Sequence, residues 1–111
     1  MNTTILINNK GFVPAPEDLG KEMMGSFLRK LWMSQDKPER IIFYGTGVML
    51  LTEESPILDA LDALFKAGVD LIACATCVGY YKLRDKIVIG RISDMQEFVS
   101  AIMKSDKVIT F

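Results

Sequence analysis

Two cysteines are the side chains best suited to chemistry in this sequence. Cys74 and Cys77 stand three positions apart in the stretch LIACATCVGYY (71–81), directly after an apolar run, and the chain has no other cysteine. A thiolate is a strong nucleophile, and helix amides or nearby cations can lower its pKa without a catalytic base. Cys74 is therefore a candidate nucleophile, and Cys77 is a candidate partner that resolves or shields its product.

The local pattern predicts how these thiols would be activated. We expect a short helix over 77–84 with Thr76 as its cap, Cys77 as its first residue and Cys74 in the preceding turn. Free amides at the helix start would then stabilise a thiolate, and three basic residues would add positive potential, namely Lys82, Arg84 and Lys86. The opposite interpretation stays open, because unpaired cysteine often packs in a core as a small hydrophobe.

Apolar runs alternate with helical patterns along the whole chain. We expect strands at 3–8, 40–47, 69–73, 86–92 and 107–111. Helices are expected at 17–33, from Ser55-Pro56 to a stop at Gly68, at 77–84, and from a Ser93 cap to 103. Because the strands are apolar almost throughout, the pattern predicts an α/β fold in one domain, 1–111. It would be a three-layer sandwich with a mostly parallel sheet of about five strands and flavodoxin-like topology.

The carboxyl edge of such a sheet is the expected place for a ligand. The loops at 8–11, 44–47 and 74–77 should meet there. We therefore expect six residues to bind substrate or wall the thiol site: Asn8, Gly45, Thr46, Gly47, Thr76 and Tyr80. Gly45-Thr46-Gly47 lacks the third glycine of a dinucleotide-binding loop, since Leu50 stands at that position, and a tight turn is the expected structure.

The composition excludes several kinds of protein. Histidine is absent, so Ser-His-Asp and Cys-His nucleophile pairs cannot form within one chain. Two cysteines without histidine also cannot close a four-ligand metal site unless a second subunit contributes ligands, so we expect no metal and leave a site shared across a symmetric interface as an alternative. Thirteen basic and fourteen acidic residues give a net charge of −1, which argues against nucleic-acid binding. No apolar run is long enough to cross a bilayer and the start lacks a secretory signal, so we expect a cytoplasmic protein that does not act on membranes.

Four stretches resemble the DsrE/DsrF-like sulfur-relay family. They are ILINNKG (5–11), EDLGKEMMGSFL (17–28), the long segment 41–95 and SDKVITF (105–111), with the pattern C-x-T-C-x-x-Y-Y-x-L at 74–83 as the most specific part. Within that family, the chain is most similar to the C-terminal domain of YedF-type proteins of selenium metabolism, which are described as sulfurtransferase-like.

The resemblance implies both an activity and partners. Active members carry sulfur as a persulfide on a cysteine after a central strand, and that position matches Cys74. The family also implies a parallel α/β fold and homo-oligomers (dimers, trimers or hexamers), with sulfur donor and acceptor proteins as partners. Persulfide exchange needs no cofactor. We therefore expect a sulfur carrier or sulfurtransferase-like protein; the alternatives are a thiol-disulfide redox protein using Cys74 and Cys77, and a non-catalytic oligomeric binding module.

Overall fold

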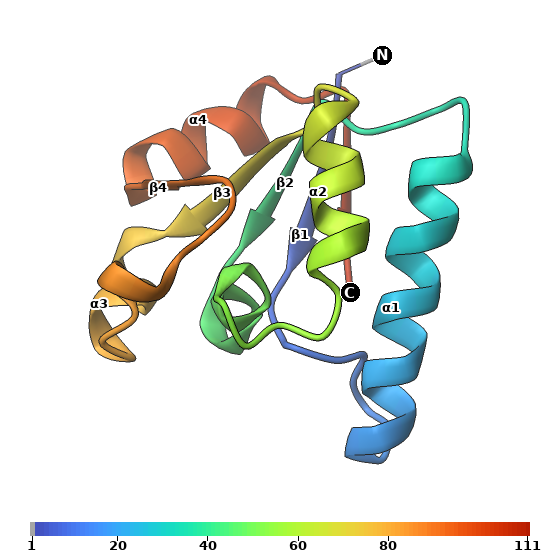
Figure 1. Ribbon diagram of the computed structural model, residues 1–111. Coiled ribbons are helices and arrows are strands. Elements are labelled where there is room, and N and C mark those ends of the chain that lie inside the picture. Colours follow the sequence, from blue (N-terminus) through green and yellow to red (C-terminus); the bar gives the residue numbers. More distant parts are fainter. Residues whose placement is uncertain (1) are drawn as a thin grey trace.

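The computed structural model describes residues 2–111, which form a five-stranded sheet flanked by helices (Figure 1). The strands are β1 (Thr3–Ile7), β2 (Arg40–Phe43), β3 (Asp70–Cys74), β4 (Arg91–Ser93) and β5 (Lys107–Thr110). The α-helices are α1 (Glu17–Met33), α2 (Leu58–Lys66), α3 (Ala75–Tyr80) and α4 (Met95–Lys104). Two 3-10 helices complete the elements, η1 (Gly45–Leu51) and η2 (Arg84–Lys86).

All neighbouring strands are parallel, in the order β4-β3-β2-β1-β5. The pairing aligns Ile7 with Phe43 and Phe43 with Ala73, so β1, β2 and β3 end at the same edge. The three loops that the sequence assigned to one edge are therefore brought together. The expected α/β class, three-layer sandwich and parallel five-stranded sheet are confirmed.

The strand order determines which face each helix covers. The chain moves in one direction from β1 to β4, and right-handed crossovers place α1 and α2 on one face. It then returns past β1 to β5, which places α4 on the other face (Figure 1). As in flavodoxin, one strand lies on one side of β1 and three lie on the other, but here the single strand is β5 rather than β2.

The two faces of the sheet bury very different amounts of apolar surface. The α1/α2 face holds the main core, which includes Phe43, Leu61 and Leu64. The α4 face has only Leu6, Ile42 and Ile72 as buried residues, against partly buried residues of α4. No residue of α4 itself is buried. The hydrophobic contribution to stability therefore comes mostly from the α1/α2 side.

A charged network attaches α4 to the sheet. Arg91 of β4 donates hydrogen bonds to both carboxylate oxygens of Asp70 on β3 and to Glu97 of α4. The Arg91 guanidinium is the main cause that lowers the pKa of Glu97 to about 2, and the Ser93 hydroxyl bound to the same carboxylate adds to the effect. The two carboxylates in turn raise the pKa of Arg91 above its usual value. Glu97 is thus ionised throughout the physiological pH range.

Two helices start later than the sequence suggested. The prediction that Ser55-Pro56 opens α2 was wrong, because the helix begins at Leu58 and Ser55 Oγ instead accepts the Ile57 N–H at 3.3 Å, in a local turn. The predicted stop at Gly68 is confirmed: this glycine has φ +97°, and its amide and that of the next residue close a Schellman motif.

The cap of α4 was also misassigned. The sequence favoured Ser93, whereas Asp94 is the N-cap and its carboxylate accepts the Glu97 N–H at 3.0 Å. Ser93 is the last residue of β4, and its hydroxyl binds the Glu97 side chain instead. Asp94 and Glu97 have the same three-residue spacing as the predicted pair that begins at Ser93, but they lie one residue later in the chain.

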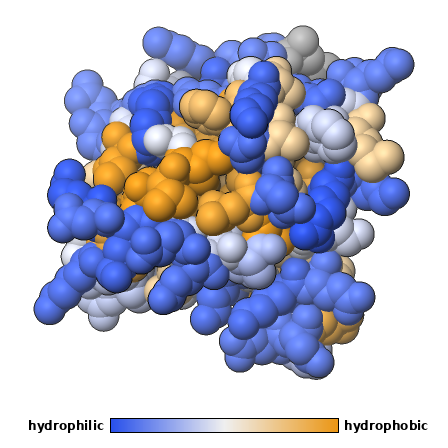
Figure 2. Space-filling view, viewed as in Figure 1, coloured by the Kyte–Doolittle hydropathy of each residue, from blue (hydrophilic) through white to orange (hydrophobic). Residues whose placement is uncertain are grey.

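The predicted strand at 86–92 is mostly irregular. Only Arg91–Ser93 pairs with β3, while Ile87 makes a single antiparallel bridge to Thr52 at the end of η1. The segment before β4 packs its isoleucines on the main core. Val88 of this segment is 54% exposed. It adds to the apolar surface of the molecule, part of which is visible in the middle of Figure 2. The apolar run thus covers the core from outside the sheet.

The segment of the chain that the structure describes contains no helix that is both long and apolar enough to span a membrane.

Candidate functional site

The two cysteines lie where β3 passes directly into α3. Cys74 is the last residue of the strand and the N-cap of the helix, and Cys77 follows one turn later, inside α3. The expected helix over 77–84 was therefore placed too late, since α3 spans Ala75–Tyr80. Thr76 is not a cap; it lies in the first turn of α3 and is exposed. The structure has no disulfide between the two cysteines.

One backbone amide is directed at a thiol, and it is not the one the sequence suggested. The Gly45 N–H, at the start of η1, donates to Cys77 Sγ at 3.1 Å. We expected amides at the start of the cysteine-containing helix to act on Cys74. Instead, the amide comes from the neighbouring strand's loop and reaches Cys77. This connection joins the carboxyl ends of β2 and β3 through a sulfur atom.

The expected lowering of the thiol pKa is wrong for Cys77. Burial raises the pKa of the Cys77 thiol above its usual value, and the Gly45 N–H opposes this shift. Cys74 raises it further, because its sulfur lies nearby and a second negative charge there is unfavourable. The two sulfur atoms are therefore near each other, and negative charge on one disfavours negative charge on the other.

The thiols differ in access to solvent. Cys74 is only 4% exposed and belongs to the main core, whereas Cys77 is partly exposed. A reagent or protein that approaches from solvent reaches Cys77 first. The core interpretation therefore fits Cys74, which packs as a core residue, whereas Cys77 is the more accessible thiol.

We expect alkylation to separate the two cysteines. In the native protein, iodoacetamide should modify Cys77 at least about tenfold faster than Cys74, because Cys74 reacts only after local opening. In denaturant the two rates should converge. Peptide mapping by mass spectrometry measures both. Equal rates in the native protein would contradict the burial of Cys74, and full resistance of both thiols until denaturation would favour a purely structural role.

The other predicted site residues line the same edge but do not all touch the thiols. Asn8 Nδ2 donates to the Tyr44 hydroxyl at 3.4 Å, and Thr46 Oγ1 accepts the Lys10 N–H at 3.3 Å. Gly47 is buried, and its N–H donates to the carbonyl of Tyr44. Of the proposed wall, only Gly45 has a hydrogen bond to a thiol among residues 2–111. Strand β2 ends at Phe43, so these glycines belong to η1 and not to the strand predicted over 40–47.

Two residues of the predicted wall point outward. Thr76 and Tyr80 are both exposed on α3, and Tyr80 packs edge-on against Tyr81 with ring centroids 5.0 Å apart. Tyr44 was not among the predicted site residues. Its hydroxyl accepts a hydrogen bond from Asn8, and its ring packs against Phe98 of α4 with centroids 5.5 Å apart. Its position directly after the second apolar strand was the available signal.

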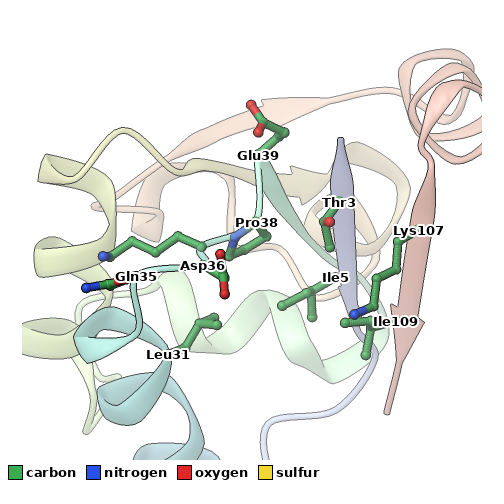
Figure 3. Close-up of a pocket in the computed structure, with 10 residues that line it drawn as sticks. Thr3, Ile5, Leu31, Gln35, Asp36, Pro38, Glu39, Lys107 and Ile109 are labelled. Carbon is green, nitrogen blue, oxygen red and sulfur yellow. The ribbon is translucent and has the colours of Figure 1, made fainter. Parts of the chain in front are cut away.

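The most prominent grooves lie elsewhere. One groove of about 480 Å³ opens at the amino end of the strands (Figure 3). Its lining includes the apolar residues Ile5, Leu31 and Ile109 and the basic residues Lys37 and Lys107. A second groove, of about 450 Å³, lies beside η1 and includes Lys10 and Met49. Neither groove is lined by Cys74 or Cys77.

No group of three His, Cys, Asp or Glu side chains within residues 2–111 is arranged to hold a metal ion. The site therefore consists of two thiols and one backbone amide, the Gly45 N–H, that donates a hydrogen bond to one of them.

Solved structures share this fold at low sequence identity. The ychN protein from E. coli has a TM-score of 0.76 at 17% identity, with all of both chains covered. MTH1491, a protein of unknown function from Methanobacterium thermoautotrophicum, has a TM-score of 0.74 at 16% identity and covers 99% of this chain and 98% of its own. BT1422, a protein of unknown function from Bacteroides thetaiotaomicron, has a TM-score of 0.69 at 14% identity, covering 99% and 94%.

Sequence comparison gives the family. No curated protein matches the chain. A sequence model described as the DsrE/DsrF-like family, however, matches residues 12–111, which include every element from α1 to β5 and both cysteines. With nearly its whole length matched, and with a parallel α/β fold shared with the ychN protein, this chain belongs to the DsrE/DsrF-like family.

Proposed function

We propose that this protein is a sulfur carrier that holds sulfur as a persulfide on the Cys74–Cys77 pair. The family is associated with sulfur relay. The observation that carries the proposal is the contact of Gly45 N–H with Cys77 Sγ at 3.1 Å, next to a second thiol at the carboxyl edge of the sheet. That amide stabilises negative charge on sulfur, and no histidine is needed. Within the family, we propose the YedF-type branch as the nearest relation, on the motif at 74–83.

Exposure favours Cys77 as the receiving thiol. Its thiolate attacks the terminal sulfur of a donor persulfide, R–S–SH; a new S–S bond forms to Cys77, the donor S–S bond breaks, and the donor leaves as the thiolate R–S⁻. The proton of the Cys77 thiol passes to solvent when the thiolate forms. A thiol with a raised pKa is ionised less often, but its thiolate is the stronger nucleophile.

Cys74 then takes the role that the resemblance gave it. Its sulfur lies near that of Cys77, so the Cys74 thiolate can attack the terminal sulfur, giving a Cys74 persulfide and returning Cys77 as a thiolate. Because Cys74 is 4% exposed, the sulfur held there is shielded from reductants in solvent. This order reverses the one expected from sequence, in which Cys74 met the donor directly.

The test is sulfur loading followed by intact mass. A small persulfide donor should add one sulfur atom to the wild-type protein. Cys77→Ser should lose at least about nine-tenths of the loading rate, and Cys74→Ser should load at a rate near that of the wild type but lose its sulfur faster to a thiol. The double variant is the control. Loading of Cys77→Ser at the wild-type rate would refute the order, and absence of loading in the wild type would refute the carrier function.

The proximity of the two sulfurs also favours one alternative, a thiol-disulfide redox protein. The same spectra separate the two functions. A carrier gains the mass of sulfur, whereas a redox protein loses two hydrogens and gains no sulfur.

We also propose that the protein forms homo-oligomers in the cytoplasm, where thiols stay reduced. The apolar face of α4 is wider than the part that packs on the sheet. Phe98 and Ile102 contact the sheet, while Met95, Val99 and Met103 are exposed at successive turns of the helix. A second copy is the simplest cover for this stripe. Trp32 is 47% exposed on α1 and offers another contact.

Self-association through α4 has a direct test. Met103→Glu places a charge in the exposed stripe and should convert the oligomer to monomer with at least about a tenfold weaker association, because a buried unpaired charge is costly. Sedimentation measures this. Lys104→Glu, on the adjacent position, is the control and should leave the assembly intact. A wild-type protein that is monomeric at high concentration would contradict the proposal.

A further inference from the structure

The segment that follows Cys77 carries a compact set of exposed side chains, which we call the basic rim: Tyr80, Lys82, Arg84 and Lys86. Tyr80 is 79% exposed and lies one helical turn beyond Cys77 on α3. Residues three apart on a helix lie on the same face, so Tyr80 is on the same face of α3 as the receiving thiol. Its only aromatic neighbour in the described chain is Tyr81. Because little of the Tyr80 side chain is buried, it contributes little to the stability of the fold.

The positive charges of the rim are not neutralised locally. Among residues 2–111, no carboxylate oxygen lies within 4.0 Å of the charged groups of Lys82, Arg84 or Lys86. Asp85 is the one acidic residue within the segment. Glu53 lies near Lys86, because the Glu53 N–H donates a hydrogen bond to the Lys86 carbonyl. The surplus of positive charge is therefore greatest at Lys82 and Arg84. It stands out in a chain whose net charge is −1.

The backbone at Lys82 suggests that its side chain has a role outside the fold. Lys82 has φ +58°, and it is the only non-glycine residue with positive φ in the described chain. It ends α3 in a Schellman motif, closed by the hydrogen bonds Lys82 N–H to Gly79 O and Leu83 N–H to Val78 O. Glycine adopts this conformation more easily than lysine. Folding alone therefore favours glycine at this position, and the lysine charge is present at a cost to stability.

We propose that the basic rim is the docking surface for a sulfur-donor protein with an acidic face around its persulfide cysteine. Acidic side chains of the donor pair with Lys82 and Arg84, an apolar side chain packs on Tyr80, and the donor persulfide then meets Cys77. The sulfur moves as described above, with the donor leaving as a thiolate. Charge complementarity of this kind mainly raises the association rate. The inference rests on the proposed carrier function and adds the class of its partner.

The experiment uses two synthetic peptides that carry the same cysteine persulfide, one flanked by glutamates and the other by lysines. The neutral donor 2-hydroxyethyl persulfide is the reference, because it needs no docking. Rates of sulfur addition to the full chain are measured by intact mass at low and high salt. At low salt the acidic peptide should transfer sulfur about tenfold faster than the basic one, and the difference should shrink as salt screens the charges.

Matched variants assign the effect to the rim. Lys82→Glu/Arg84→Glu should reverse the preference for the acidic peptide over the basic one. Dividing each peptide rate by the rate with 2-hydroxyethyl persulfide removes any effect of the two charges on the thiols themselves. Lys104→Glu/Lys107→Glu makes the same charge change at the opposite end of the strands and should keep the preference. Lys82→Gly should be more stable than the wild type yet slower with the acidic peptide, a combination that misfolding cannot produce. Tyr80→Ala should also slow the acidic peptide.

The outcomes separate the two proposals. If 2-hydroxyethyl persulfide loads the protein but the acidic and basic peptides transfer at equal rates, the docking surface is wrong and the carrier function stands. If both double variants lose the preference equally, overall charge and not the rim is responsible, and the docking surface is again wrong. If none of the three donors adds sulfur, the carrier function itself fails.

Discussion

Gly47→Ala should destabilise the protein by about 3 kcal/mol, because an added methyl group collides with backbone that cannot move aside. Gly47 is buried in η1, and a Cβ there would run into the carbonyl oxygen of Ile7 at the end of β1. The collision pushes η1 away from the sheet and takes the Gly45 amide with it. Sulfur loading should therefore slow as well, since that amide holds Cys77. Urea unfolding gives the change in free energy.

The control is Gly79→Ala, in α3 two residues after Cys77. No atom lies within 4 Å of the position that its Cβ would occupy, and its φ is not positive. Alanine there should stabilise the protein by roughly 0.5–1 kcal/mol, because it lowers the conformational freedom of the unfolded chain in a helical position. Equal unfolding midpoints for Gly47→Ala and the wild type would show that η1 does not lie against β1 as described.

Leu61→Ala should cost roughly 2–5 kcal/mol, a large part of the roughly 5–15 kcal/mol that stabilises a domain of this kind. Leu61 is fully buried on α2 and belongs to the main core against the sheet. Removing its branched end leaves a cavity that rigid neighbours fill only in part. The midpoint of urea unfolding should fall with little change in slope.

Phe65 provides the comparison for Leu61. It lies one turn later on the same helix but is 50% exposed. Phe65→Ala removes a larger side chain and should cost less, about 1 kcal/mol, because less apolar surface returns to water. A larger loss for Phe65→Ala than for Leu61→Ala would mean that α2 is rotated relative to the arrangement described, or that Phe65 is covered by another copy.

The sequence predicted the elements with strong, continuous patterns and missed the ones fixed by distant contacts. The helix at 17–33 matched α1 residue for residue, because its apolar stripe is long and ends in a turn at Ser34. The run at 86–92 is equally apolar, but its first half is held by Thr52 and by the carbonyl of Leu51 outside the sheet. Periodicity cannot distinguish a buried strand from an extended segment that covers a core.

The site was predicted in its location but not in its details. Parallel strands ending together were enough to bring the loops at 8–11, 44–47 and 74–77 to one edge. Which thiol would receive an amide depended on the path of η1, which no local pattern encodes. The prediction that helix-start amides would act on Cys74 considered only the expected helix at 77–84. The amide that does donate to a thiol, that of Gly45, donates to Cys77 and lies about thirty residues earlier in the chain.

The thin layer on the α4 face has a consequence for partial unfolding. Helix α4 has no buried residue, so this helix should detach at a lower free energy than the rest of the domain. Detachment would expose Leu6, Ile42 and Ile72 to solvent as an apolar patch, while the core on the opposite face, which includes Cys74, stays packed. Such openings are a route to aggregation, and a neighbouring copy clamped over α4 would suppress them.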